Sequence, residues 1–511
     1  MTVKRIFAIF ICLLLLCGCQ NDLDAYVPTG DGLTWEDGQN PVGPQTDTQQ
    51  ELTLIYYPGK TMNPLNSTDF TNRALLSLIY QGLFATDRNY TVHPILCRNY
   101  RVSQDMKTYT FYLENATFSD GAMLTAGDVI ATLEAARTSP YYSGRFQHIK
   151  TITLGEDNSV VVNLNTPMEN LPILLDIPIL KASELELTHP LGTGPYYLDV
   201  AGGTALLHRR NNWWCSAAFA VTAPAISLME AVDNPQIRDS FEFSSLDLVC
   251  ADPGSDRYAD YRCDFELWDS ENGIFLYLLC NMESAIFSNE KVRAALTTAI
   301  DRDALVEAEY RGFARSASLP ASPNSPYSSQ VLAAKYAYDG TGETLKNAVE
   351  SAKMVDAPLV LLVNKGDSLR VRQAQAIAEM LTAAGFKVTV NQCSESSYLK
   401  NLKNREYDLC LAQTKLSPNM DLSPFFSSSG SLSYGKISDA AIYALCREAL
   451  ANRGNYYTLH QTVMNDGRLC PILFRSYAVY ATRGLLTELT PSRDNIFFYS
   501  LGKTMDEALL K

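Results

Sequence analysis

Residues 118–129 read FSDGAMLTAGDV, and this stretch decides the local fold on both of its sides. Residues 119–121 are Ser-Asp-Gly, which is a turn signal. Thr125 then predicts a helix N-cap, and Asp128, three residues later, comes close to completing a capping box. The apolar positions that follow repeat at the spacing of a helix with one buried face: Val129, Ile130, Leu133 and Ala136. The stretch therefore predicts a tight turn that leads into an amphipathic helix.

Strand-like and helical segments surround this stretch. Alternating or continuous apolar runs predict strands, and three-to-four spacing predicts helices. In the first half of the chain we expect strands at 52–57, 108–113 and 160–164, a helix at 73–83 ended by Gly82, and a tight turn into a strand at 192–197.

The second half of the chain predicts a buried sheet. Residues 275–279 are continuously apolar, as in a strand covered on both faces. Ser288 is the expected cap of one helix, and Asp301 caps a second helix that Gly312 ends. A strand, a helix and a strand then follow in a βαβ unit with a parallel pair, and one more buried strand comes after it: 359–363, 368–384, 387–390 and 407–412. The expected class is α/β with at least one mixed sheet.

The first twenty residues predict a bacterial lipoprotein leader. Lys4 and Arg5 precede an apolar run, residues 6–16, which is too short for a membrane-spanning helix but suits a signal peptide. Residues 16–19 read LCGC, a lipobox pattern, so we expect cleavage after residue 18 and lipidation of Cys19. A plain secretory signal is the alternative. Residues 19–50 hold almost no aliphatic side chains and are expected to form a flexible tether.

Composition bounds the remaining possibilities. A chain of 511 residues exceeds the size of one hydrophobic core, so two or three domains are expected. The net charge is -14, and no basic cluster follows the leader, which disfavours a nucleic-acid partner. Nine cysteines lie beyond the leader, an odd number with no C-x-x-C pair, so most are expected to be unpaired. A bridge between Cys250 and Cys263 stays open.

Six motifs in the same order resemble those of one protein family. They are NPL at 63–65, IYQGLF at 79–84, YRVS with TYTFYL at 100–113, FSDGAMLTAGDV at 118–129, GTGPY at 192–196 and VRAALTTAIDR at 292–302. This series resembles the extracellular solute-binding proteins of family 5, which include oligopeptide, dipeptide and nickel binders. The resemblance covers residues 51–500.

The resemblance implies a fold and a function. The fold is α/β of the periplasmic-binding-protein type II kind, with two lobes that close on a hinge and an extra inserted domain. The implied parts are lobe I at 51–83, 191–270 and 482–511, domain II at 84–190, and lobe II at 271–481. The implied function is that of the substrate-binding lipoprotein of an ABC importer, on the extracytoplasmic side of the membrane, which captures an oligopeptide-like solute as a monomer, works with permease subunits, and needs no cofactor.

The resemblance also suggests binding residues, and the sequence departs from the family pattern at two places: the family's turn Glu is Gln81 here, and a later segment differs as well. Family members that bind peptides use an Asp, in a W-x-x-D segment, for the peptide amine. Here Lys415 stands in place of the Trp and Pro418 in place of the Asp, while Asp421 lies three positions later. Lys415 is a candidate to receive a carboxylate, and Asp421 a candidate to receive the amine. The remaining residues that the resemblance places in the cleft are Gln81, Tyr141, Asn281 and Asn419.

Other functions fit the sequence less well. The five histidines form no metal-ligand pair, although a binder of chelated metal needs few protein ligands. A secreted hydrolase with a nucleophile elbow is disfavoured, since no Gly-x-Ser-x-Gly motif is present. A non-peptide binder, or a sensor or chaperone that feeds no importer, stays open.

Overall fold

Two long strands lie at the centre of the largest sheet. They are β12 (Phe265–Cys280) and β17 (Leu469–Thr482), which pair antiparallel along most of their length. The computed structural model describes residues 52–216, 223–255, 260–484, 489, 491–493 and 495–497. The predicted signal peptide, tether and lipidated Cys19 lie outside these residues, as does most of the predicted 482–511 segment.

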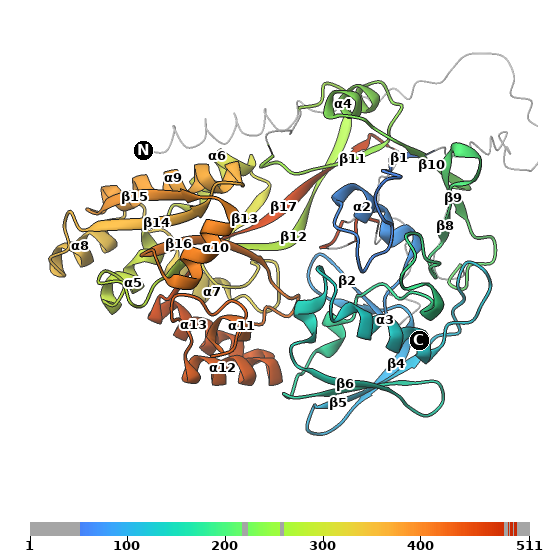
Figure 1. Ribbon diagram of the computed structural model, residues 1–511, viewed down its shortest axis with the longest axis horizontal. Helices are drawn as coiled ribbons and strands as arrows, with labels where there is room; N and C mark the ends of the chain where they lie inside the picture. The colour runs from blue at the N-terminus through green and yellow to red at the C-terminus, as the bar shows by residue number, and fades with distance from the viewer. Residues whose placement is uncertain are drawn as a thin grey trace, which may run out of the picture. The chain divides into compact units, whose positions relative to one another are not determined.

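The sheet around these two strands has seven strands. Its order is β11-β17-β12-β16-β14-β15, with β13 paired to β17. Figure 1 shows β12 and β17 running from β11 towards β16. The neighbouring strands are β11 (Leu248–Ala251), β13 (Ala314–Ser316), β14 (Pro358–Asn364), β15 (Lys387–Cys393) and β16 (Leu409–Lys415).

Helices pack on the seven-stranded sheet and complete its core. The predicted βαβ unit is confirmed: β14 and β15 are parallel, and α9 (Ser368–Ala383) connects them. The other helices of this part of the chain are α5 (Glu290–Leu296), α6 (Arg302–Tyr310), α7 (Gln330–Ala333), α8 (Glu343–Ser351), α10 (Glu395–Asn404), α11 (Ser423–Phe426), α12 (Ala440–Ala451) and α13 (Tyr456–Asp466).

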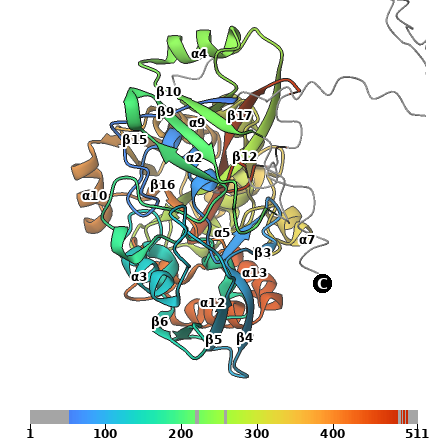
Figure 2. The ribbon, with the colours of Figure 1, turned by 90° about the vertical axis from the view of Figure 1, so that its right-hand side faces the viewer.

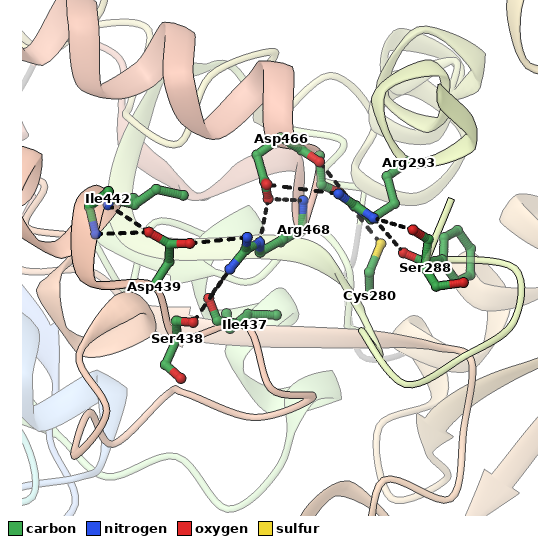
Figure 3. A network of polar contacts seen from close by, with 12 residues as sticks. Cys280, Ser288, Arg293, Ile437, Ser438, Asp439, Ile442, Asp466 and Arg468 are labelled. Atoms are coloured by element: carbon green, nitrogen blue, oxygen red, sulfur yellow. Dashed lines mark hydrogen bonds and ion pairs between the residues drawn. The ribbon is translucent and has the colours of Figure 1, made fainter. Parts of the chain in front are cut away.

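A polar network ties these helices to the sheet. Arg468 forms ion pairs with Asp439 at 3.1 Å and with Asp466 at 2.7 Å. Arg293 donates to the carbonyls of Asp466 and Ser288 at 3.0 and 3.1 Å (Figure 3). Since these partners connect α5, α12 and α13, we interpret the network as one that stabilises the packing of these helices.

Three smaller sheets complete the described strands. An antiparallel sheet of order β4-β5-β7-β6 lies beside α3 (Ala126–Ala136) (Figure 2), and we call residues 84–190 around it the β4–β7 unit. Its strands are β4 (Cys97–Val102), β5 (Thr108–Leu113), β6 (Ile149–Leu154) and β7 (Val160–Leu164). The other two sheets are β1-β10-β9-β8 and β2-β3, with bounds β1 (Leu52–Ile55), β2 (Phe84–Thr86), β3 (Val92–Pro94), β8 (Tyr196–Asp199), β9 (Ala205–Arg209) and β10 (Ala225–Met229).

The capping box that opens α3 is confirmed. The Thr125 hydroxyl accepts from the Asp128 amide at 3.3 Å, and the Asp128 carboxylate accepts from the Thr125 amide at 3.0 Å. α4 (Asn234–Glu242), which follows β10, has Asp233 as its N-cap.

Two local predictions were wrong. The helix expected at 73–83 is α2 (Phe70–Ile79), which begins earlier because Asp69 caps it through the Asn72 amide. It ends before Gly82, where an added Cβ would lie 2.9 Å from the Asp176 carbonyl carbon, so close backbone approach explains the glycine. Ser288 does not cap α5. Asn289 does, since its side chain accepts from the amides of Lys291 and Val292.

The sequence predicts that most cysteines are unpaired. All nine cysteines of the described residues are free, so the expected lack of pairing is confirmed and Cys250 and Cys263 are not bridged. Within the described ranges, no helix combines the length and apolar character needed to cross a membrane.

Candidate functional site

A cavity of about 90 Å³ lies at the end of α2, and we call it the α2 cavity. Gln81, one of the predicted site residues, lines it together with Arg73, Tyr142 and Trp213. The Gln81 side-chain oxygen accepts from Trp214 Nε1 at 3.0 Å, and its carbonyl accepts from the Ile179 amide at 2.9 Å. Gln81 therefore combines a place on the cavity wall with a structural role.

A second, more open cavity of about 490 Å³ lies where β14 ends, and we call it the β14 cavity. In α/β sheets, ligands bind outside the carboxyl ends of the strands, and Asn364 is the last residue of β14. The wall is strongly charged, with both signs present, and sequence reasoning did not identify it: Asp252, Asp367, Arg370, Glu395 and Arg475.

The charged groups of the β14 cavity are held in pairs. Arg475 forms an ion pair with Asp252 at 2.6 Å, and Arg370 pairs with Asp367 at 2.8 Å. The Asn364 amide donates to the Glu395 carboxylate. Asp252 precedes β12 while Asn364 follows it, so the wall combines segments that lie before and after β12 in the sequence.

Tyr141 and Lys415 were both predicted site residues, and the structure brings them together. The Lys415 ammonium donates to the Tyr141 hydroxyl and lies 3.7 Å from the centroid of its ring. The Arg73 guanidinium carbon lies 3.2 Å from the same centroid. Cation–π attraction therefore contributes to this contact between β16 and the β4–β7 unit.

Asn281 sits at the end of β12, and its side chain bonds within the sheet region. Its amide donates to the carbonyls of Arg405 at 3.1 Å and Tyr407 at 2.8 Å. Its oxygen accepts from the Glu283 amide at 3.1 Å. These bonds close a strand end, and a solute contact at Asn281 stays a prediction.

Asn419 and Asp421 lie in the buried loop after β16. Asn419 lines a third cavity of about 210 Å³, and its side chain accepts from the Ser417 hydroxyl at 2.7 Å. Asp421 is 6% exposed and pairs with His148 Nε2 at 2.8 Å, while its other oxygen accepts from the Ser423 amide at 2.8 Å. Both carboxylate oxygens of Asp421 are thus occupied by protein groups, and amine binding there stays a prediction.

A buried polar cluster lies beside the point where β12 bends. The register of β12 against β17 shifts between Glu271 and Phe275. The Tyr90 hydroxyl and the Ser322 hydroxyl both donate to the Glu271 carboxylate. Burial raises the pKa of Glu271, although these hydrogen bonds and nearby Arg493 oppose the shift. The cluster joins the β4–β7 unit to β12.

Metal ligands do not gather in the part of the chain that the structure describes. No group of three or more His, Cys, Asp or Glu side chains there has the arrangement to hold an ion.

The fold and these cavities define a class, the type II periplasmic-binding fold in which two lobes and an extra domain surround a solute cleft. The chain belongs to the bacterial extracellular solute-binding proteins, family 5, since the sequence profile of the family's middle region matches residues 91–434.

Individual relatives agree with this family. The chain is 26% identical over 314 residues to the glutathione-binding protein GsiB of Escherichia coli O157:H7, covering 56% of this chain and 59% of GsiB. The match therefore spans only about three fifths of that relative.

Solved structures share the fold. NikA from Brucella suis, in complex with Fe(III)-EDTA, matches with a TM-score of 0.69 at 18% identity, covering 87% of this chain and 98% of NikA. The unliganded, open periplasmic murein tripeptide-binding protein MppA matches with a TM-score of 0.73 at 15% identity, covering 89% of this chain and 97% of MppA. The predicted fold class is confirmed.

Proposed function

We propose that this chain captures a peptide-like solute between two lobes and delivers it to the permease subunits of an ABC importer. The β14 cavity carries the proposal, because its wall combines residues from before and after hinge strand β12. Its volume of about 490 Å³ lies in the range of small-molecule sites, about 300 to 1,000 Å³. The family membership and the peptide and glutathione binders among its relatives support a solute of this kind.

The charges of the β14 cavity favour a zwitterionic solute. Two cations, Arg370 and Arg475, and three acids, Asp252, Asp367 and Glu395, lie on one wall. A short peptide carries an amine and a carboxylate, so each end can meet an opposite charge there. Asp421 is 6% exposed, whereas Asp252 and Asp367 are 32% and 22% exposed, so the proposal places amine recognition on the acids of this cavity.

The remaining parts of the proposal concern the cell envelope. Residues 1–18 serve as the signal peptide, Cys19 carries the lipid, and 19–50 tether the folded part to the extracytoplasmic face. Three parts of the chain move about the hinge, and they are lobe I (51–83, 191–270 and 482–511), domain II (84–190) and lobe II (271–481). Closure on solute presents the surface that the permease recognises. The chain acts as a binding protein, without catalysis.

Thermal unfolding with a panel of di- to pentapeptides tests the proposal. A bound peptide at 100 times its Kd stabilises the native protein by about 2.7 kcal/mol. Arg475→Ala and Asp367→Asn should each abolish most of that shift. Arg238→Ala, which changes an exposed arginine of α4 paired only to its neighbour Asp239 within the described contacts, is the matched control and should keep it. Shifts with non-peptide solutes or chelated metals alone would refute the peptide assignment, and no shift with any solute would refute solute capture.

A further inference from the structure

Polar contacts cross from the β4–β7 unit to the helices of the seven-stranded sheet, and we call this contact zone the seam. Its members come from distant parts of the chain, and they are His148, Glu169 and Asn170 on one side and Tyr327, Asp421, Leu450 and Arg453 on the other.

The central contact of the seam is the His148–Asp421 pair. Nε2 of His148 and Oδ2 of Asp421 are 2.8 Å apart, and the two side chains are 7% and 6% exposed. Each partner is anchored in its own part of the fold. The His148 carbonyl accepts from the Asn165 amide at 2.9 Å, and Asp421 accepts from the Ser423 amide at 2.8 Å. The pair therefore joins two rigid segments.

Glu169 supplies two further bonds across the seam. Its amide donates to the Leu450 carbonyl at 2.8 Å, and its carboxylate accepts from the Arg453 amide at 2.6 Å. Glu169, Leu450 and Arg453 line the third cavity, of about 210 Å³. The seam is thus bridged by specific polar contacts around an open space, beside a hydrophobic core that includes residues from both of its sides, such as Met168 and Leu450.

We propose that His148 is a positioning residue, and that its pair with Asp421 is a latch that holds the β4–β7 unit against lobe II before any solute binds. The inference rests on the proposed two-lobe function and concerns its regulation. The seam bonds join protein groups to one another, so they favour the arrangement in which the β4–β7 unit lies against lobe II, which the proposal takes as the closed arrangement. A protein whose closed state is already populated binds solute with an apparent affinity raised in proportion to that population.

The latch also explains the place of Asp421. The loop that carries it begins directly after Lys415, which contacts Tyr141 of the β4–β7 unit. Fixing Asp421 through His148 therefore fixes the loop and sets Lys415 and Asn419 in their closed positions. His148 acts through this loop rather than by touching solute.

Hydrogen exchange of the seam amides in the solute-free purified protein tests the latch. The amides of Glu169 and Arg453 donate across the seam, so their exchange reports its opening. We expect His148→Ala to speed exchange at both amides about tenfold or more, which corresponds to about 1.4 kcal/mol. Amides of Leu278 and Leu279, inside the β12–β16 pairing, should keep the wild-type rate.

A matched control uses another His–Asp pair. His93 lies 3.2 Å from Asp87, and both belong to the β4–β7 unit, so His93→Ala should leave the exchange of Glu169 and Arg453 unchanged. If His148→Ala also exposes Leu278, the fold itself is lost, and His148→Phe, which keeps the volume without the ring nitrogens, provides the comparison instead.

Three results would overturn the latch. If the His148 variant exchanges the Glu169 and Arg453 amides at the wild-type rate, while solute still slows these amides in the wild type, only the latch is refuted. Equal acceleration by His93→Ala refutes the specificity of the pair. If both amides exchange only through global unfolding, in every variant and with or without solute, the seam never opens. In that case the proposed lobe closure fails as well.

Discussion

Gly273 stands at the bend of hinge strand β12, and substituting it by alanine gives the sharpest test of how the hinge is built. Its φ is +71°, and a Cβ added there would lie 2.4 Å from Cζ of Arg493. Arg493 is 8% exposed and donates to the carbonyl of Leu416, the residue after Lys415. The substitution therefore strains the backbone and displaces the guanidinium together.

The two effects have separate magnitudes. A left-handed backbone costs an alanine about 1 kcal/mol, and loss of a hydrogen bond from a charged donor costs about 1.5–3 kcal/mol. We expect Gly273→Ala to lower the free energy of unfolding by about 2.5–4 kcal/mol, measured by urea denaturation.

Gly121→Ala is the matched control. Gly121 has a φ of +86° but nothing within 4 Å of its added Cβ, so only the backbone cost of about 1 kcal/mol applies. If Gly273→Ala were no more destabilising than Gly121→Ala, Arg493 would not brace the hinge, and the reasoning would be refuted.

Three further predictions concern single side chains. His460 is fully buried, its ring nitrogens have no hydrogen-bond partner among the described residues, and burial lowers its pKa from 6.5 to about 3. As pH falls below about 6.5 the unfolded chain therefore binds a proton at His460 that the native state does not bind, so the free energy of unfolding of the wild type declines. Between pH 7 and pH 5 the stability of His460→Leu should rise by about 2 kcal/mol relative to the wild type, measured by urea titration at each pH. A stability difference that stays the same at both pH values would refute the buried neutral histidine. Thr125→Ala should lower the unfolding free energy by about 1 kcal/mol through loss of the α3 cap, and Asn158→Ala, which removes a bond to the Ala126 amide at the same helix end, provides a comparison. Trp214→Phe removes the indole donor to Gln81 at the α2 cavity, and because the proposal places the solute in the β14 cavity, solute affinity measured by titration calorimetry should stay unchanged, whereas a loss of affinity would place the solute in the α2 cavity.

Local structure was predictable where short-range chemistry decides it. Thr125 and Asp128 define the start of α3 through a bond pattern that needs only adjacent residues. The start of α2 was missed because Asp69, rather than apolar periodicity, sets it. The cap of α5 was misplaced by one residue because Ser288 and Asn289 are both good caps, and only tertiary packing chooses between them.

The site was predictable only in part. The family resemblance indicated Tyr141 and Lys415, and they meet although 274 positions separate them. The charged wall of the β14 cavity could have been suspected from Asn364, since polar residues after a buried strand mark its carboxyl end. The His148–Asp421 contact had no sequence signal, because it depends on how two separate sheets pack.

Identification of the solute itself tests the central claim most directly. We would purify the protein gently, denature it, and analyse the released small molecules by mass spectrometry. The account predicts short peptides, or solutes with both an amine and a carboxylate, which rebind and raise the Tm of the wild-type protein but not of Arg475→Ala. Released solutes that lack these groups, or that stabilise Arg475→Ala as strongly as the wild type, would contradict it.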